Sequence, residues 1–583
     1  MPRLLPTLTS AGARARSASK GAEGVLLAVY APIGTDERLS RYPNPDPAAP
    51  IAPIARQALV RELQKTAAEG VNVCALIDIF DDDTYLVEIP AFKPASISIV
   101  SAWKQNMSDR HALTGFLRRA HHRFPCQAIV LAIEGHGGGF VPDIDLARIT
   151  PETYSQVIGS DGLPRPVSWL QGRDLVSIVA PTAPPAPAAA PAGGRTRQII
   201  SPDFGVERSA ATRDGPTEED PNQMISPDLQ MISPDLPASQ LPLSTWAYGE
   251  ALRAAIRAGV PKPAVIHFNN CFNASVELLH TVAPYADYAT GYANYDFFLA
   301  GQAYPQVFKN LRLAGSATAE QLAKWFALET GKILDHKDFH PIIAGTVRLS
   351  RMKAVAAAID ALALELTKVL RGPGGAAARA RIKAAATAAQ HYDTEPGYEL
   401  KVPDQFVDIA SFAGAIKDQF GPGPVDTAAA ALEATLANIW QFGDKDTPWM
   451  ANNAAIVYDF RDKRLGLNIF FPDPDLRGKW DWRSPYYLSG KVDPTKPPAH
   501  RHVIPFLADV REQRPRWVEF IVEYHKETEF VGFFPARAPF FPIFNLRYKP
   551  DGGGDNPPPA PTPAPTPTPG GPGKPPTGGP VRG

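Results

Sequence analysis

Two residues with reactive side chains, His136 and Cys271, each follow a short apolar run. His136 comes after Ala128-Ile-Val-Leu-Ala-Ile-Glu-Gly, and Cys271 comes after Ala264-Val-Ile-His-Phe-Asn-Asn. Apolar runs of this length that stop at Gly or Asn clusters are typical of buried parallel strands. Functional residues of an open α/β sheet lie at the carboxyl ends of its strands. Neighbouring strands would therefore bring a thiol and a base together, as nucleophilic catalysis by cysteine requires.

Three glycines follow His136, so the backbone beside the imidazole carries no side chains. Glycine permits close approach of a substrate, and the amide of Gly137 could hold an oxyanion. Taken alone, a His-Gly pair is better explained as a histidine that ends a strand before an ordinary glycine turn. The amide of Cys271 is a natural second oxyanion donor.

The segment after Cys271, Phe272-Asn-Ala-Ser-Val-Glu277, is predicted to begin a helix. A thiol at a helix N-terminus has a lowered pKa and more thiolate. The alternative is a small buried hydrophobic residue, which is the usual place of a cysteine outside disulfides. Asn269 and Asn270 just before Cys271 argue against deep apolar burial.

The other two cysteines, Cys74 and Cys126, are expected to be structural. Cys74 lies inside an apolar run, and Cys126 precedes the strand that leads to His136. Three cysteines in 583 residues make a disulfide framework improbable.

Other chemistries lack their key residues. His-Gly-Gly-Gly also occurs as an oxyanion motif in serine esterases, but no Gly-x-Ser-x-Gly follows it in the sequence. The sequence has no His-Glu-x-x-His, paired Cys-x-x-Cys, Walker A or dinucleotide fingerprint, so no metal site is predicted.

Composition sets wider bounds. The chain is long enough for two or more domains, its hydrophobic content is 44%, and its net charge of -1 gives no sign of nucleic-acid binding. No apolar run reaches the length of a membrane helix, so an integral membrane protein is not expected. The first 24 residues lack the apolar core of a secretory signal, and a cytoplasmic location is expected.

The pattern along the chain alternates strands and helices. This predicts an α/β fold with a mostly parallel sheet and helices on both faces, and with a partly helical C-terminal region. Strands are expected at 24–32, 71–80, 84–89, 128–133, 264–268, 453–460 and 465–471. Helices are expected at 54–68, 109–123, 244–258, 274–279, 317–328, 350–370, 376–389, 426–440 (with Asp426 as N-cap) and 516–525.

Three segments lack such patterns. Residues 1–22 and the Pro/Gly-rich tail 551–583 are predicted to be disordered, and residues 181–241 are predicted to form a flexible insertion. That insertion carries the phrase Ile-Ser-Pro-Asp three times.

The chain resembles the clostripain family of cysteine peptidases, which share the caspase-like fold with gingipains and caspases. The matching blocks keep the family's order and together span roughly residues 24 to 525. They are Val25–Tyr30, Val71–Asp78, Pro125–Leu131 running to His136-Gly-Gly-Gly, Asn269–Glu277 running to Tyr285–Tyr288, Phe406–Ile409, Leu465–Pro472 and Arg516-Trp517.

The resemblance implies that His136 is the general base and acid, that Cys271 is the nucleophile, and that Gly137 and Cys271 supply the oxyanion amides. It implies a cysteine endopeptidase with a protein or peptide substrate. It places the caspase-like domain at 23–350 and a mixed region that completes the fold at 351–550. A monomer is expected.

One departure concerns substrate choice. The family usually has aspartate two residues before the cysteine, in the S1 pocket, where this chain has Asn269. A neutral amide cannot pair with a cationic P1 side chain as a carboxylate does, so a basic P1 preference is in doubt. Asp296 is a candidate for the missing charge, although an ordinary loop aspartate is the favoured interpretation.

Relatives are often activated by cleavage between the His and Cys blocks, where the insertion lies, and an activating protein would fit this pattern. Cleavage after Asp would use the repeated phrase, and cleavage after a basic residue would use Arg195, Arg197, Arg208 or Arg213. Slippage in an unconstrained linker explains the repeats equally well. The alternative function is a catalytically restrained caspase-like module that binds partner proteins.

The peptidase is expected to require no cofactor. Calcium binding is the one exception that stays open, because some relatives are sensitive to calcium. Asp78, Asp81, Asp82 and Asp83 offer oxygen ligands, but they lack the spacing of a calcium loop. A solvated hairpin turn is the favoured interpretation of this cluster.

Overall fold

The computed structural model describes part of the chain, including the strands and helices on which the candidate site depends. The described residues are 24–32, 51–78, 84–103, 107, 109–135, 137–144, 243–294, 301–335, 342–392, 406–437, 449–451, 466–471, 487, 500–507 and 516–524. The predicted segments 1–22, 181–241, 453–460 and 551–583 lie outside them.

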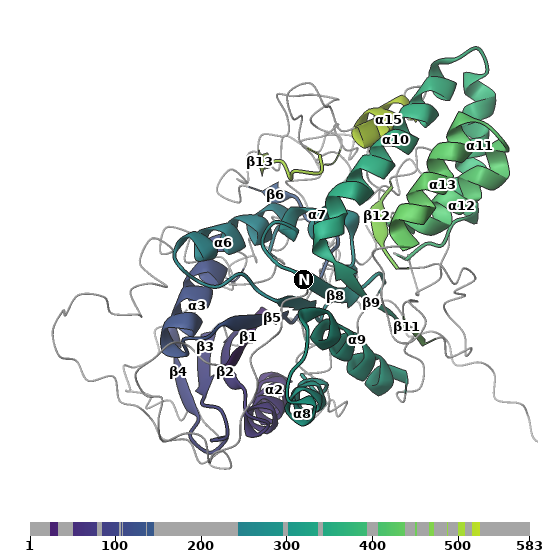
Figure 1. The fold of residues 1–583 in the computed structure, drawn as a ribbon. Coiled ribbons are helices and arrows are strands. Elements are labelled where there is room, and N and C mark those ends of the chain that lie inside the picture. Colours follow the sequence, from purple (N-terminus) through teal and green to yellow (C-terminus); the bar gives the residue numbers. More distant parts are fainter. Residues whose placement is uncertain are drawn as a thin grey trace, which may run out of the picture.

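Nine of the described strands form one sheet, in the order β11-β9-β8-β7-β5-β1-β2-β3-β4 (Figure 1). The five central strands pair in parallel, and two further strands at each edge pair antiparallel. The central strands are β1 (Val25–Pro32), β2 (Asn72–Asp78), β5 (Ala128–Ile133), β7 (Val265–Phe268) and β8 (Tyr288–Tyr292). The edge strands are β3 (Thr84–Ile89), β4 (Ser98–Trp103), β9 (Ile342–Arg348) and β11 (Trp449–Ala451).

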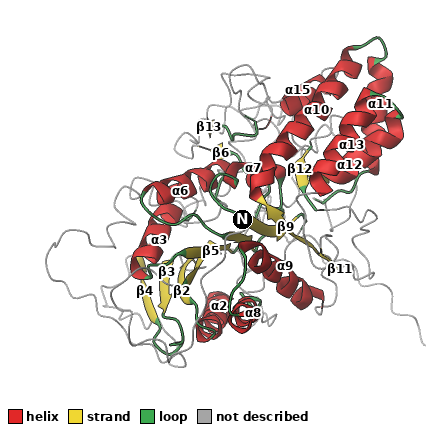
Figure 2. Cartoon of the chain, viewed as in Figure 1, coloured by secondary structure: helices red, strands yellow, loops and turns green. Residues whose placement is uncertain are grey.

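Helices cover both faces of the sheet, as Figure 2 shows. Strand side chains alternate between two cores: Ile129 and Leu131 of β5 face one, and Val130 and Ala132 face the other. The first core is packed by α3 (Arg110–Arg123), α6 (Thr245–Arg257) and α7 (Val276–Val282). The second is packed by α2 (Ile51–Ala68), α8 (Tyr304–Ala314) and α9 (Ala319–Asp335). The predicted α/β architecture is confirmed.

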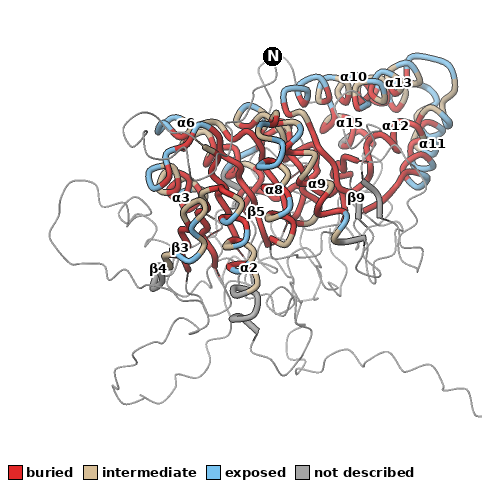
Figure 3. The backbone as a smooth tube through the Cα atoms, turned by 60° about the horizontal axis from the view of Figure 1, so that its bottom comes forward, coloured by how far each residue is buried: buried red, intermediate tan, exposed pale blue. Residues whose placement is uncertain are grey.

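A helical layer extends the first core beyond the sheet (Figure 1). It consists of η6 (Leu349–Arg351), α10 (Met352–Arg371), α11 (Gly375–Ala388), α12 (Ile409–Phe420), α13 (Pro424–Ala437) and α15 (Arg516–Tyr524). Its buried residues belong to the same cluster as those of α3 and α7. Figure 3 shows the inner sides of these helices buried, and exposed residues along the outer sides of α10 and α11.

Two short antiparallel pairs connect distant segments. β10 (Phe406–Asp408) pairs with β12 (Asn468–Phe470), and β6 (Asp143–Ile144) pairs with β13 (His500–His502). Asp408 also caps α12, because its side chain accepts a hydrogen bond from the Ser411 amide at 2.8 Å.

Most predicted helices occur with ends shifted by a few residues, and the predicted β2–β3 hairpin is present. Asp426 is not an N-cap, because α13 begins at Pro424 and Asp426 lies in its first turn. The strands β8 and β9 were not predicted; glycine interrupts both of them, which weakens a strand pattern. Each described helix is either too short or too polar to cross a membrane.

Replacing Trp517 should test how α15 is held. The indole is fully buried, packs against Phe412, Phe471 and Phe520, and donates to the Tyr487 hydroxyl at 3.0 Å. We expect Trp517→Ala to lower the free energy of unfolding by about 3–5 kcal/mol, measured by urea denaturation, since it removes a large buried ring.

The matched control is Glu519→Gln on the same helix, which removes a partly exposed ion pair with Arg371 and should cost less than about 1 kcal/mol. Equal effects of the two changes would mean that Trp517 does not anchor the helix.

Candidate active site

The two strands that lead to His136 and Cys271 are direct neighbours. β5 and β7 pair in parallel, with Ile133 opposite Phe268. The Asn269 amide donates to the Ile133 carbonyl at 2.8 Å, and the Glu134 amide donates to the Tyr30 carbonyl at 2.9 Å. The hydrogen bonding of the sheet therefore continues one residue beyond β5 and β7. Both segments leave the sheet at the carboxyl ends of its parallel strands.

The backbone that follows His136 lies against Cys271. A Cβ atom added to Gly137 would stand 2.0 Å from the Cys271 carbonyl oxygen and 2.8 Å from the Cys271 nitrogen. Real Cβ atoms do not approach backbone atoms so closely, so only glycine fits at position 137 without displacing residue 271. His136 itself lies outside the described residues.

The glycines after His136 are held by one side chain. The amides of Gly138 and Gly139 donate to Asn273 Oδ1 at 3.4 and 3.1 Å. Asn273 Nδ2 donates in turn to Asn270 Oδ1 at 2.6 Å. Among the described residues the Gly137 amide has no hydrogen-bond acceptor.

The turn that carries Cys271 is fixed from both sides. Phe272 has a φ of 60°, a left-handed backbone that costs a non-glycine residue about 1–2 kcal/mol. Its amide donates to the Asn294 carbonyl at 2.9 Å. Asn468 Nδ2 donates to the carbonyls of Phe272 and Ala293 at 2.8 and 2.7 Å. A distant segment therefore holds the strained turn in place.

The helix predicted to begin directly after Cys271 begins later, so this prediction was wrong. α7 starts at Val276, and Ser275 is its N-cap, with its hydroxyl accepting from the Leu278 amide at 3.1 Å. The Ala274 amide donates instead to the Tyr292 carbonyl of β8 at 2.9 Å. Because the turn is attached to the sheet edge, the thiol does not stand on a helix N-terminus.

The three cysteines differ in burial. Cys74 and Cys126 are 0% and 3% exposed, whereas Cys271 is partly exposed. Burial raises the pKa of the Cys74 thiol far above its usual range. Cys271 is therefore the most accessible thiol in the chain.

A buried polar network lies behind the two strand ends. Asn269 Nδ2 donates to Glu134 Oε2 at 2.8 Å, and the Tyr292 hydroxyl donates to Asn269 Oδ1 at 3.2 Å. The Tyr304 hydroxyl donates to the other Glu134 oxygen. Burial raises the pKa of Glu134 to about 7, although the hydrogen bonds from Tyr304 and Asn269 act in the opposite direction.

Sequence reasoning missed His267, which lies within β7. It is 1% exposed, its Nδ1 lies 2.6 Å from Thr290 Oγ1, and its ring packs on Phe326. Burial lowers the pKa of His267 to about 3, so the ring stays neutral at physiological pH. The only sequence signal of this network was the presence of the polar residues Glu134, His267 and Asn269 in or directly after two apolar runs.

The remaining candidates are placed as follows. Asn269, expected in the S1 pocket, is 2% exposed, and Asp296 lies outside the described residues. Asp78 is buried at the end of β2, with Thr84 Oγ1 donating to it at 3.4 Å, and Asp81–Asp83 are not described. Within the described ranges no three His, Cys, Asp or Glu residues are grouped to hold a metal ion.

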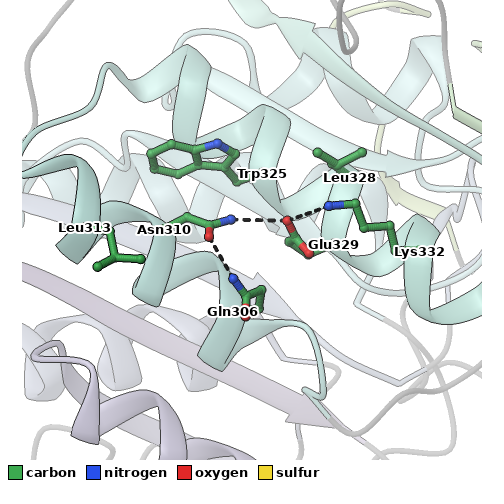
Figure 4. A pocket seen from close by; sticks show the side chains of 7 residues that line it. All are labelled: Gln306, Asn310, Leu313, Trp325, Leu328, Glu329 and Lys332. Atoms are coloured by element: carbon green, nitrogen blue, oxygen red, sulfur yellow. Dashed lines mark hydrogen bonds and ion pairs between the residues drawn. The ribbon is translucent and has the colours of Figure 1, made fainter.

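A separate cleft of about 640 Å³ lies between α8 and α9 (Figure 4). Asn310 and Lys332 both bind Glu329 Oε1 there, at 3.1 Å each. None of the residues that line this cleft belongs to the network around Cys271: they are Gln306, Asn310, Leu313, Trp325, Leu328, Glu329 and Lys332.

Comparison with known proteins gave structural matches only. No family model and no curated protein matches the chain. A secreted C11 cysteine protease from Bacteroides thetaiotaomicron, solved with an irreversible peptide inhibitor, matches at 13% identity and a TM-score of 0.43, over 81% of this chain and 97% of the protease.

A zymogen C11 protease from Parabacteroides distasonis matches at 10% identity and a TM-score of 0.42, over 78% of this chain and 93% of that one. A clostripain from Bacteroides thetaiotaomicron matches at 14% identity and a TM-score of 0.28, over 40% of this chain and 87% of the clostripain. The solved structures to which this chain is similar include proteases of the family that its sequence resembles.

Gly137→Ala should disturb the candidate site directly. The added methyl group would force the Cys271 backbone away, so we expect the protein to lose about 1–3 kcal/mol of stability, by the cost of overpacking. The displaced thiol of Cys271 should also be alkylated by iodoacetamide at a rate different from that of wild type, followed by peptide mass spectrometry.

The matched control is Gly423→Ala, where the new methyl group meets nothing within 4 Å. If both variants kept the stability and the Cys271 alkylation rate of wild type, the close approach of residues 137 and 271 would be wrong.

Glu134→Gln should change how stability depends on pH. The carboxyl pKa is raised from 4.5 to about 7, so between these values the folded protein holds a proton that the unfolded chain has released. The free energy of unfolding of the wild type therefore falls as pH rises through this window. Above the window, Glu134 no longer changes the free energy of unfolding with pH.

Glutamine lacks this proton, so the stability of Glu134→Gln relative to wild type should rise between pH 4.5 and 7, by on the order of 3 kcal/mol. Urea denaturation across this pH range measures it, and a difference independent of pH would contradict the raised pKa.

Proposed function

We propose that this chain is a cysteine endopeptidase that hydrolyses peptide bonds through Cys271 and His136. The observation that carries the proposal is the contact of Gly137 with the backbone of Cys271. It brings the residue that follows His136 against the most accessible thiol, as a Cys/His dyad requires.

In this mechanism the Cys271 thiolate attacks the scissile carbonyl carbon and forms a tetrahedral intermediate. The amides of Gly137 and Cys271 bind the oxyanion, which suits a Gly137 amide without an acceptor among the described residues. His136 takes the thiol proton and gives it to the leaving amine. Water, activated by His136, then hydrolyses the acyl-enzyme.

Because Cys271 does not lie at a helix N-terminus, thiolate formation depends mainly on His136. The substrate is a protein or peptide, with Asn269 and Asp296 as the candidate S1 residues. Cleavage within 181–241 activates or regulates the enzyme, with calcium or a protein as the candidate signal. The proposed enzyme is a cytoplasmic monomer.

An active-site probe tests the nucleophile. A peptidyl acyloxymethyl ketone should label wild type at Cys271, located by peptide mass spectrometry, because only an activated thiolate beside the oxyanion donors reacts quickly. Cys271→Ala and His136→Ala should lower peptidase activity at least about 1,000-fold. The matched control, Cys126→Ala, removes a buried thiol and should retain activity and labelling.

Activity that survives Cys271→Ala would contradict the proposal and favour a serine esterase. A well-folded wild type without labelling or activity would favour the restrained module that binds partner proteins.

Intact mass of freshly purified protein tests self-processing. We expect wild type to be cut within 181–241 and Cys271→Ala to stay whole, and the new termini will give the P1 residue. Identical cutting of both proteins would show that another protease is responsible.

A further inference from the structure

Glu134 and Asn269 occupy equivalent places in the two strand ends. Glu134 lies two residues before His136, and Asn269 lies two residues before Cys271. Their side chains meet across the β5–β7 pair, with Asn269 Nδ2 donating to Glu134 Oε2 at 2.8 Å. This hydrogen bond joins the segment that carries the proposed base to the segment that carries the proposed nucleophile.

The Glu134 carboxylate is in an unusual setting. It is 0% exposed, and among the described residues no Lys or Arg forms an ion pair with it. Its partners are two neutral donors, Asn269 and the Tyr304 hydroxyl at the start of α8. Burying a carboxylate without a cation costs free energy. The two hydrogen bonds that it accepts offset part of this cost.

A carboxylate at this place decides which way the Asn269 amide turns. An ionised carboxylate only accepts hydrogen bonds, so it selects Nδ2 of Asn269 and directs Oδ1 toward the Tyr292 hydroxyl. A neutral acid could donate from one oxygen and would weaken that choice. The orientation of Asn269 is therefore coupled to the charge of Glu134.

The Asn269 segment continues directly into the site. Its own amide is fixed to Ile133 at 2.8 Å. The next residue, Asn270, accepts from Asn273, which holds the amides of Gly138 and Gly139. A shift of Asn269 would therefore be transmitted to Cys271 and to the glycine segment.

Other titratable groups face this network. They are His267 on β7, Tyr292 on β8 and Tyr304 on α8. Burial lowers the pKa of His267 to about 3. Burial raises the pKa of Glu134 to about 7, so the charge of Glu134 changes near neutral pH.

We propose that Glu134 is a positioning residue for this site, acting through Asn269 to fix the two strand ends and to orient the side chain expected in the S1 pocket. This inference rests on the proposed peptidase function for its kinetic consequence. Its structural part concerns the surroundings of Cys271 and can be tested without peptidase activity.

A reciprocal exchange of the two side chains is the sharpest test. Glu134→Gln replaces the acid by an isosteric amide, and Asn269→Asp places two carboxylates against each other. The double variant Glu134→Gln/Asn269→Asp restores one acid and one amide in the opposite order. The control, Glu88→Gln, removes another buried acid, which pairs with Arg119 and Arg123 at the far side of the sheet.

Two readouts are taken from pH 5 to 9. The first is the rate at which iodoacetamide alkylates Cys271, followed by peptide mass spectrometry; this reagent reacts with any accessible thiolate. The second is kcat and KM on a peptide whose P1 residue is taken from the self-processing site or, without one, from a P1-scanning library.

We expect Glu134→Gln to remove an inflection near pH 7 from the alkylation profile and to lower kcat about tenfold. Asn269→Asp should lower kcat about 100-fold, since two adjacent carboxylates repel or one must bind a proton. The double variant should recover at least about tenfold of that loss. Glu88→Gln should retain the wild-type profile and kcat.

Two results would overturn the positioning role. One is an alkylation profile that is the same in wild type and Glu134→Gln. The other is a double variant no better than Asn269→Asp. If wild type shows no peptidase activity while the alkylation profiles differ as expected, the proposed function fails and the positioning role of Glu134 stands.

Discussion

The close approach of two backbones at the end of the β5–β7 pair is the constraint on which the site depends. Parallel pairing brings the chain after Ile133 and the chain after Phe268 out at the same edge. Gly137 then meets Cys271 at a separation that leaves no room for a side chain. Everything proposed about the chemistry follows from this contact, because it turns two residues more than a hundred positions apart into neighbours.

Holding that contact has a cost, which the surrounding polar groups offset. Phe272 adopts a left-handed backbone, and Asn468 donates a hydrogen bond to its carbonyl. Asn273 performs a similar role for the glycine amides. The late segment around β12 is therefore part of the site's support, and its residues Ile469 and Phe470 belong to the core that the C-terminal helical layer shares with the sheet.

Local sequence patterns predicted which helices and strands occur better than they predicted where one element ends and the next begins. The apolar runs of β1, β2, β5 and β7 were found because buried parallel strands are continuous in hydrophobicity. The start of α7 was misplaced, since the hydrogen bond from Ala274 to Tyr292 of β8 and the Ser275 cap override the helical preference of residues 272–275. The short, glycine-containing strands β8 and β9 were missed because pairing with neighbours, not local sequence, defines them.

The sequence by itself determined the α/β class, the two strand ends and the contrast between Cys271 and the other cysteines, because apolar periodicity and flanking Gly or Asn residues are local properties. Only the tertiary structure decided the strand order, the contact of Gly137 with Cys271 and the pairing of Glu134 with Asn269. Those features join segments far apart in the chain. Their energies arise from burial and hydrogen bonding, which exist only once the sheet has formed.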